Sequence, residues 1–273
     1  MRLCLRLTIL AGLMIFLSAS AGMRPAVGAE SPRETGSGLE TMVLVDAGEF
    51  VMGSSDEDLR GIPSGVMDSY SDEKPKRRVY LKAFYIDKYP VTNAQFRKFG
   101  KPKQASDSKF EGDTQPVVGV TWSQARDYCR SVGKRLPTEA EWEKAARGVD
   151  GRIFPWGDQW DGSKVIWWKN SGRKSHPVDR TDNTHQSPYG AVDMAGNVWE
   201  WVSDWYQADY YQNAPNRNPP GPSSGTRRVI RGGSWLPNDI FPRIFRAPNR
   251  SSNQPDEPGD WLGFRCAKSI EGS

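Results

Sequence analysis

Short apolar runs separated by polar turns dominate the chain after residue 40. The runs at 42–45 and 49–52 predict two short strands joined by a turn at Ala47-Gly48. Alternation of apolar and polar residues over 79–87 predicts a third strand. The intervening segment 54–78 is polar and ends in a run of charges. That composition is typical of a solvated loop, although lids over binding sites share it.

Three helices are predicted next, and each begins with the same kind of capping sequence. A threonine precedes each helix and a Gln or Glu follows three positions later, so the two side chains satisfy two unpaired backbone amides reciprocally. A glycine ends each helix, as is common at helix C-termini. The capping pairs are Thr92 with Gln95, Thr121 with Gln124 and Thr138 with Glu141, and the final glycines are Gly100, Gly133 and Gly148.

Two of these helices present an apolar face that predicts burial against a core. On the second helix this face consists of Trp122, Ala125, Tyr128, Cys129 and Val132. On the third helix it consists of Ala140, Trp142, Ala145 and Ala146. The residue types on both helices indicate a scaffold, and none of them is typical of catalysis.

The chain after Gly148 shows little periodicity and many turn-forming residues. It is nevertheless rich in tryptophan, and the whole chain contains 11 Trp with 27 Gly and 20 Pro. Tryptophan supplies a large buried area per residue, so these loops are expected to be ordered by aromatic packing. The composition therefore favours a loop-rich fold over a helix bundle or a doubly wound sheet.

The N-terminus has the pattern of a secretory signal peptide. Arg2 and Arg6 precede an almost wholly apolar run at 7–17, which is shorter than the roughly 20 residues of a membrane-spanning helix. Cleavage is predicted after Ala21 or Ala29, and an uncleaved membrane anchor is the alternative. We therefore expect a signal peptide at 1–29, a polar flexible linker at 30–40 and one domain at 41–269, exported and most simply periplasmic.

Charge gives no reason to expect a nucleic-acid partner. Removal of residues 1–29 takes away three arginines and no acidic residue, so the net charge falls from +4 to +1. The high isoelectric point of the whole chain thus owes much to the leader, and a basic binding surface is not indicated. We expect a monomer without a stable membrane span once the leader is cleaved.

The chain contains three cysteines, of which Cys4 lies in the predicted leader. In an oxidising compartment the remaining pair, Cys129 and Cys266, is most simply a disulfide. A redox-active pair is the alternative.

In several runs, taken in chain order, the sequence resembles the formylglycine-generating enzyme (sulfatase-modifying factor) domain family. The resemblance covers residues 41 to 268. The matching runs include Gly48 to Ser54, Phe84 to Asp87, Val91 to Phe96, Gly133 to Glu143, Asp193 to Trp201, Arg231 to Ser234 and Leu262 to Cys266. It implies an α+β fold with little regular secondary structure, related to the C-type lectin fold. It also implies a structural disulfide between Cys129 and Cys266.

The resemblance further implies structural calcium. By position, the ligands would be the side chains of Asp193 and Glu200 with the carbonyls of Gly196 and Val198. Ca²⁺ readily combines carboxylates with backbone carbonyls. The alternative is that both carboxylates cap turns or pair with arginines. A second calcium site of the family would fall near Asn170 and Ser171, although its downstream acidic loop does not align here.

The chain departs from the family after the Arg231 to Ser234 run. The oxidases that make formylglycine carry two cysteines there that bind Cu(I), an ion suited to soft thiolates. Pro237 and Pro242 occupy these positions here, so copper is not expected and formylglycine-generating activity is not predicted. The only histidines, His176 and His185, would suffice for an iron site only together with Asp179 or Asp182; surface histidines are the alternative.

Without the copper ligands, the resemblance still implies a binding cleft lined by aromatic, hydroxyl and arginine side chains. Its predicted members are Trp199, Ser234, Trp235, Asn238, Arg246 and Trp261. Such side chains form a platform for a peptide, a sugar or an aromatic ligand. A buried structural role for Arg246, paired with an acidic residue, is the competing interpretation.

Two functions follow from these expectations. The first is an exported accessory or maturation factor that binds a protein, peptide or small-molecule partner in the cleft. The second is a periplasmic enzyme of the same fold that performs oxidative tailoring without cysteines, as siderophore-maturation members of the family do. Whether the chain is an enzyme is left open by the sequence, and no catalytic residue is assigned.

Overall fold

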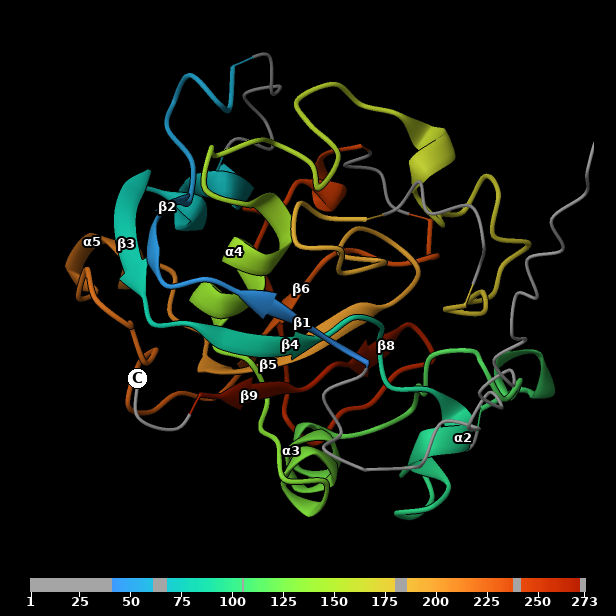
Figure 1. The fold of residues 1–273 in the computed structure, drawn as a ribbon. Helices are drawn as coiled ribbons and strands as arrows, with labels where there is room; N and C mark the ends of the chain where they lie inside the picture. Colours follow the sequence, from blue (N-terminus) through green and yellow to red (C-terminus); the bar gives the residue numbers. More distant parts are fainter. Residues whose placement is uncertain (1–40, 61–67, 105, 180–185, 238–241, 271–273) are drawn as a thin grey trace, which may run out of the picture. The chain divides into compact units, whose positions relative to one another are not determined.

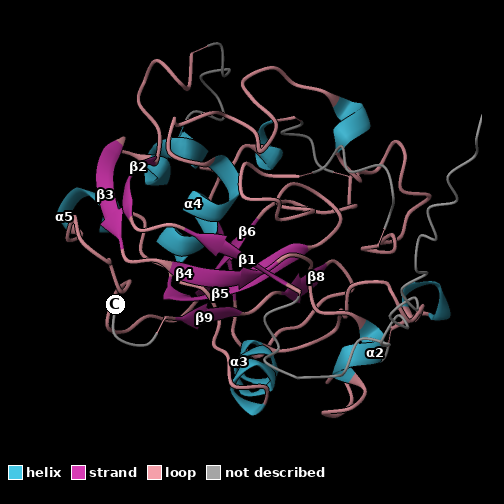
Figure 2. Cartoon of the chain, in the orientation of Figure 1, coloured by secondary structure: helices cyan, strands magenta, loops and turns pink. Residues whose placement is uncertain are grey.

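A computed structural model describes residues 41–60, 68–104, 106–179, 186–237 and 242–270. The predicted signal peptide and linker lie outside these residues. The described part combines short strands and helices with long loops, as Figure 2 shows, which is the α+β, loop-rich fold expected from the sequence. Within it, no helix has the length and apolar character needed to cross a membrane.

Nine strands form three separate sheets among the described residues (Figure 1). The first sheet has the order β1-β4-β9, the second pairs β2 with β3, and the third has the order β7-β6-β5-β8. The strands are β1 Met42–Val45, β2 Gly48–Met52, β3 Arg77–Leu81, β4 Phe84–Asp87, β5 Trp199–Trp205, β6 Arg228–Arg231, β7 Ser251–Asn253, β8 Leu262–Phe264 and β9 Ala267–Ser269.

The two N-terminal strands, β1 and β2, do not pair with each other as a hairpin with its turn at Ala47-Gly48 would require. Met42 pairs with Asp87 on β4, whereas Phe50 pairs with Val79 on β3, so the two N-terminal strands belong to different sheets. The predicted third strand at 79–87 is likewise divided into β3 and β4. A break of two residues lets the chain pass from one sheet to the other, which local alternation cannot reveal.

Helical segments occur where the capping sequences predict them. The α-helices are α2 Asn93–Phe96, α3 Trp122–Ser131, α4 Glu139–Arg147 and α5 Tyr210–Asn213, and the 3₁₀ segments are η1 Asp68–Glu73, η2 Ser108–Phe110, η3 Gly162–Lys164 and η4 Arg243–Phe245. All three predicted capping boxes are formed, at the starts of α2, α3 and α4. The first predicted helix is shorter than expected, since α2 ends well before Gly100.

The apolar face of α3 is buried except for Val132, which follows the helix and is 46% exposed. Cys129 on this face is joined to Cys266 by a disulfide with Cα atoms 5.6 Å apart. Both residues are fully buried. The bond ties α3 to the segment between β8 and β9.

Helix α4 is buried on every side, beyond the single apolar face predicted for it. It contacts β2, β3, β5 and β6, and it lies among these strands in Figure 1. Trp142 fills its apolar side, while Glu139, Glu143 and Arg147 are equally buried. Charged side chains tolerate such burial only when they are paired, so this helix must be surrounded by compensating charges.

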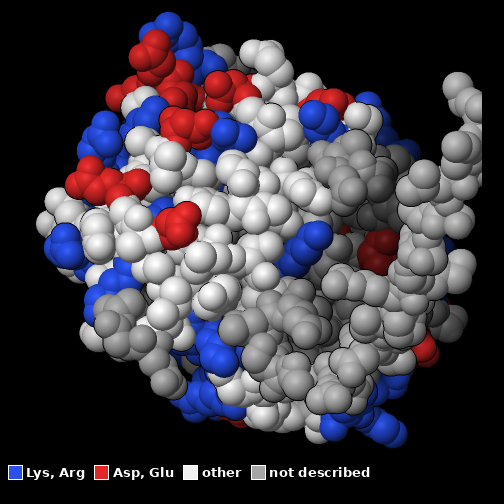
Figure 3. Space-filling model, in the orientation of Figure 1, with Lys and Arg blue, Asp and Glu red and all other residues white. Residues whose placement is uncertain are grey.

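The polar segment after β2 is not simply a solvated loop. Figure 3 shows a face on which acidic and basic side chains are intermixed. Exposed ion pairs such as that of Lys74 with Asp56 occur in this segment. Its 3₁₀ segment η1, however, is docked by buried contacts: Glu73 accepts two hydrogen bonds from Arg246 at 3.0 and 3.2 Å. The buried ion pair holds η1 against the C-terminal part of the domain.

Candidate functional site

Arg231, the last residue of β6, fixes the loop that carries Ser234. Its Nη1 donates to Glu139 at 3.1 Å and its Nη2 donates to Glu143 at 2.7 Å. The side chain is fully buried, so α4 holds the start of this loop through two ion pairs that water does not screen.

The two glycines that follow Arg231 permit close packing of the loop. Gly233 has φ +78, and a Cβ atom there would lie 2.7 Å from the ring of Phe245. Gly232 has φ +99 and would place a Cβ 3.2 Å from the ring of Trp142. A larger residue at either position would strain the backbone and move an aromatic ring, so the glycines set the position of Ser234.

A groove of about 310 Å³ lies next to this loop, across strands β5, β6 and β7. Its walls combine two indole rings with several hydroxyl groups and one guanidinium group. The lining residues are Trp199, Arg227, Ile230, Ser234, Leu236, Pro237, Ile244, Ser251, Ser252, Asn253 and Trp261. The volume is at the lower end of what small-molecule sites enclose, and it also suits a few residues of a peptide.

The predicted cleft residues are partly brought together. Trp199, Ser234 and Trp261 line the groove, as expected. Asn238 lies outside the described residues. Arg227 and the three residues of β7 were missed by the sequence interpretation, because no local signal distinguishes them from other polar surface residues.

Trp235 and Arg246 are not among the residues that line the groove, contrary to the prediction that both belong to the cleft. The Trp235 ring packs on Phe110, and its Nε1 donates to the carbonyl of Asp260 at 3.1 Å. Arg246 is buried and pairs with Glu73, as the structural alternative proposed. Both side chains are occupied by internal partners and support the walls instead of facing a ligand.

The copper-binding positions of the family oxidases can also be placed relative to the groove. Pro237 is part of its wall, and Pro242 immediately precedes η4, whose Ile244 is another lining residue. Proline offers neither a side-chain ligand nor a backbone N–H. The described part of the groove therefore contains no thiolate for Cu(I).

The stretch expected to bind calcium forms a loop that is closed by its own hydrogen bonds. Asp193 and Asn197 adopt left-handed backbone conformations, with φ 59 and φ 65. The side chain of Asn197 donates to Asp193 at 2.9 Å and to the carbonyl of His176 at 3.1 Å. Asn197 is fully buried, and it is the central residue of the loop although the sequence interpretation gave it no role.

Glu200, the other predicted carboxylate ligand, is engaged by an arginine. Arg265 donates to both of its oxygens at 2.7 Å, and Trp142 donates to one of them at 2.8 Å. These bonds use three of the roughly four acceptor sites of a carboxylate, so at most one remains for a cation. Calcium binding through Asp193 and the carbonyls of Gly196 and Val198 stays a prediction, and a fall in melting temperature on chelation would test it.

The remaining metal predictions find little support in side-chain geometry. The oxygen of Asn170 accepts from the amide of Trp167 at 2.9 Å, and Ser171 caps its own turn by accepting from Arg173. The ring of His176 lies 2.9 Å from the carbonyl of Ser171. Within the described residues no cluster of three His, Cys, Asp or Glu side chains could hold a metal, and His185 and Asp182 lie outside them.

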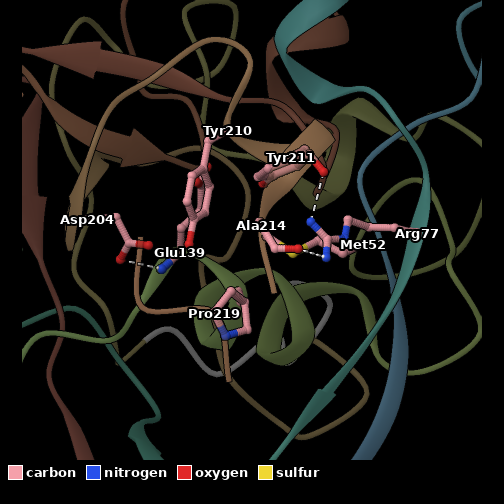
Figure 4. A pocket seen from close by; sticks show the side chains of 9 residues that line it. Met52, Arg77, Glu139, Asp204, Tyr210, Tyr211, Ala214 and Pro219 are labelled. Carbon is pink, nitrogen blue, oxygen red and sulfur yellow. Dashed lines mark hydrogen bonds between the residues drawn. The ribbon is translucent and has the colours of Figure 1, made fainter. Parts of the chain in front are cut away.

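A second, much smaller cavity of about 10 Å³ lies at the start of α4 (Figure 4). It is large enough for about one water molecule, and Glu139, Asp204, Tyr210 and Arg77 are among its walls. Asp204 accepts from the backbone N–H of Glu139 at 2.9 Å, which caps the helix. Burial, reinforced by the nearby charge of Glu139, raises the pKa of Asp204 to about 8.

The raised pKa of Asp204 predicts a pH dependence of stability. Between its ordinary pKa of 3.8 and about 8, the folded chain binds a proton that the unfolded chain has released. The free energy of unfolding contributed by this group therefore falls as the pH rises through that window. Asp204→Asn should remove this slope, so the variant should gain stability relative to the parent between about pH 4 and about pH 8. Urea unfolding at both ends would measure it, and parallel curves for the two proteins would contradict it.

Comparisons with known proteins agree with the residue-level resemblance. The Sulfatase-modifying factor enzyme 1-like domain matches residues 28–270. The formylglycine-generating enzyme of Streptomyces coelicolor is 34% identical over 93% of this chain and 97% of its own length. The inactive C-alpha-formylglycine-generating enzyme 2 of Bos taurus is 32% identical over 83% of this chain and 87% of its own.

A solved structure shares the fold. PvdO from Pseudomonas aeruginosa superposes with a TM-score of 0.66 and 27% identity, over 84% of this chain and 94% of its own. Because the family model matches most of the chain and relatives at 32–34% identity cover most of its length, the chain belongs to the formylglycine-generating enzyme (sulfatase-modifying factor) family.

Proposed function

We propose that this chain is an exported accessory or maturation factor that binds a peptide segment of its partner in the groove between Trp199 and Trp261. The observation that carries the proposal is the position of Pro237 in the groove wall, beside Ser234 and both indole rings. The groove has the volume and hydrogen-bonding groups needed to hold a ligand, whereas proline, a residue that binds no metal, stands at a position where the resemblance implies a copper ligand.

The groove walls favour a peptide over an apolar ligand. Ser234, Ser251, Ser252 and Asn253 offer hydroxyl and amide groups to main-chain polar atoms, and Trp199 and Trp261 offer flat apolar surface to side chains. Export rests on the signal peptide predicted at 1–29. The alternative is a periplasmic oxidative tailoring enzyme that uses chemistry other than cysteine and copper.

Affinity selection from a random peptide library would test the binding function. We expect the purified chain to retain a defined set of peptides, and Trp261→Ala to weaken their binding by about tenfold, as loss of a central aromatic contact does. Trp168→Ala is the matched control, because Trp168 is 42% exposed and lies outside the groove. Equal retention by the parent and by Trp261→Ala would contradict the proposed binding site.

A second measurement separates binding from oxidation. We expect a sulfatase-motif peptide, incubated with the chain and added copper, to keep its cysteine when analysed by mass spectrometry. Conversion to an aldehyde would refute the claim that Pro237 and Pro242 abolish this chemistry. Oxidation of any peptide retained from the library, in air, would instead favour the tailoring enzyme.

A further inference from the structure

Arg227 carries the only charge among the described residues that line the groove. The other lining side chains are aromatic, aliphatic, hydroxyl or amide groups, and none of them is acidic. A ligand in the described part of the groove therefore meets a single positive charge, and no lining carboxylate there neutralises it. A partly enclosed site strengthens the interaction of such a charge with an anion relative to bulk water.

The guanidinium of Arg227 is held in a fixed orientation by β7. Its Nε donates to the hydroxyl of Ser252 at 2.9 Å, and its Nη2 donates to the carbonyl of the same residue at 2.7 Å. These bonds occupy the edge of the guanidinium formed by Nε and Nη2. Ser252 is the one residue of the described chain that accepts hydrogen bonds from this side chain, and both acceptors are neutral.

The orientation leaves the other edge of the guanidinium, formed by Nη1 and Nη2, for a ligand. Two parallel N–H groups on one edge match the two oxygens of a carboxylate, and such paired charge-assisted bonds are stronger than neutral ones. Because two bonds already order the side chain, little conformational entropy remains to be lost when the ligand binds. Ser251 and Asn253 flank Ser252 on the same wall and can hydrogen bond to the adjoining backbone.

We infer that the groove selects peptides that carry a carboxylate, which Arg227 binds through its Nη1 and Nη2 edge. The inference rests on the proposed peptide-binding function and adds the chemical class of the ligand. The carboxylate comes either from an Asp or Glu side chain or from a peptide C-terminus. Both sources present the same pair of oxygens, so the experiment has to separate them.

The test is affinity selection from two random peptide libraries, one with amidated and one with free C-termini. For the parent chain we expect Asp and Glu to exceed Asn and Gln by about tenfold at one position of the retained peptides, the ratio typical of one charge-assisted contact. Retention confined to the library with free C-termini would assign Arg227 to a terminal carboxylate. Higher ionic strength should reduce the preference, because salt screens a partly exposed charge.

Variants of Arg227 give the decisive comparison. Arg227→Gln should abolish the acidic preference, and Arg227→Lys should keep part of it, because lysine retains the charge but lacks the paired N–H edge. Arg217→Gln is the matched control, since Arg217 is exposed, stacks on Tyr80 and does not line the groove. Thermal melting checks that each variant is folded. The salt dependence is measured on the parent, so it tests the inference even if a variant fails to fold.

The outcomes distinguish this inference from the function on which it rests. Equal retention from both libraries without an acidic preference, or an acidic preference unchanged in Arg227→Gln, overturns the inference and leaves peptide binding intact. If the parent retains no more peptide than Trp261→Ala does, the proposed function and the inference are overturned together.

Discussion

Replacing Glu139 with glutamine should lower the free energy of unfolding by about 3–5 kcal/mol, the usual cost of breaking a buried ion pair by removing one partner. Glu139 accepts from Arg231 at 3.1 Å and from Arg250 at 2.7 and 2.9 Å, and all three side chains are buried. Burial alone would raise the pKa of Glu139, but the charges of Arg250 and Arg231 outweigh it and hold that pKa below its ordinary value. The neutral variant leaves one buried positive charge without compensation.

Urea unfolding of the variant and the parent measures this loss. Glu49→Gln is the matched control, because the pair between Glu49 and Arg78 is 3.9 Å long and exposed, and such pairs contribute little. Combining Glu139→Gln with Arg250→Met should recover much of the stability, since both charges are then removed. A single variant as stable as the Glu49→Gln control would show that the network does not depend on the charge of Glu139.

Loss of the disulfide should cost a similar amount, about 4–5 kcal/mol in the chain-entropy account, for the double variant with Cys129→Ala and Cys266→Ala. The bond closes a loop between residues 137 positions apart, so without it the unfolded chain gains considerable conformational freedom. The alanines also remove two fully buried sulfur atoms, which adds a small packing loss. Unfolding of the parent with and without reductant gives an independent measurement.

The double variant also provides the control for the reductant, because it has no disulfide to reduce. We expect reductant to leave its unfolding unchanged. Thiol labelling adds a second readout, because Cys129→Ala should expose one reactive thiol, that of Cys266, when the chain is unfolded. A parent whose stability is indifferent to reductant would rule out the proposed contribution of the bond.

The two contributions reach the groove by different routes. The Glu139 network positions Ser234 through Arg231, whereas the disulfide ties α3 to the segment that follows β8. Stability variants near Glu139 should therefore also weaken ligand binding, whereas the disulfide acts through Cys266, which follows the lining residue Trp261 by five positions. The groove depends on charged groups that are themselves hidden from solvent.

Local sequence determined much of the secondary structure. The capping pairs that begin α2, α3 and α4 each act within one turn of helix, so the residues needed to recognise them are adjacent in the sequence. Gly148 ends α4 in the same local manner, with φ 73. The family, and with it the fold, was also recognisable from the sequence, because the matching runs occur in the family's order and with its spacing.

Strand partners and burial of charge were decided by the tertiary structure. Glu143 and Arg231 are 88 positions apart, and Arg246 and Glu73 are 173 apart, so nothing local indicated that α4 would be charged and yet buried on all sides. The division of 79–87 between two sheets has the same origin, since its partners lie on β2 and β1.

Some features of the groove were likewise predictable from the sequence, whereas others were decided by the tertiary structure. The sequence alone identified Trp199, Ser234 and Trp261 through the family match, and it located the missing copper ligands at Pro237 and Pro242. Only the folded chain brought β7 and Arg227 beside them and directed Trp235 and Arg246 into internal contacts. Local patterns specify helices and turns because their hydrogen bonds join near neighbours, whereas a binding site is assembled from long-range contacts that no single segment encodes.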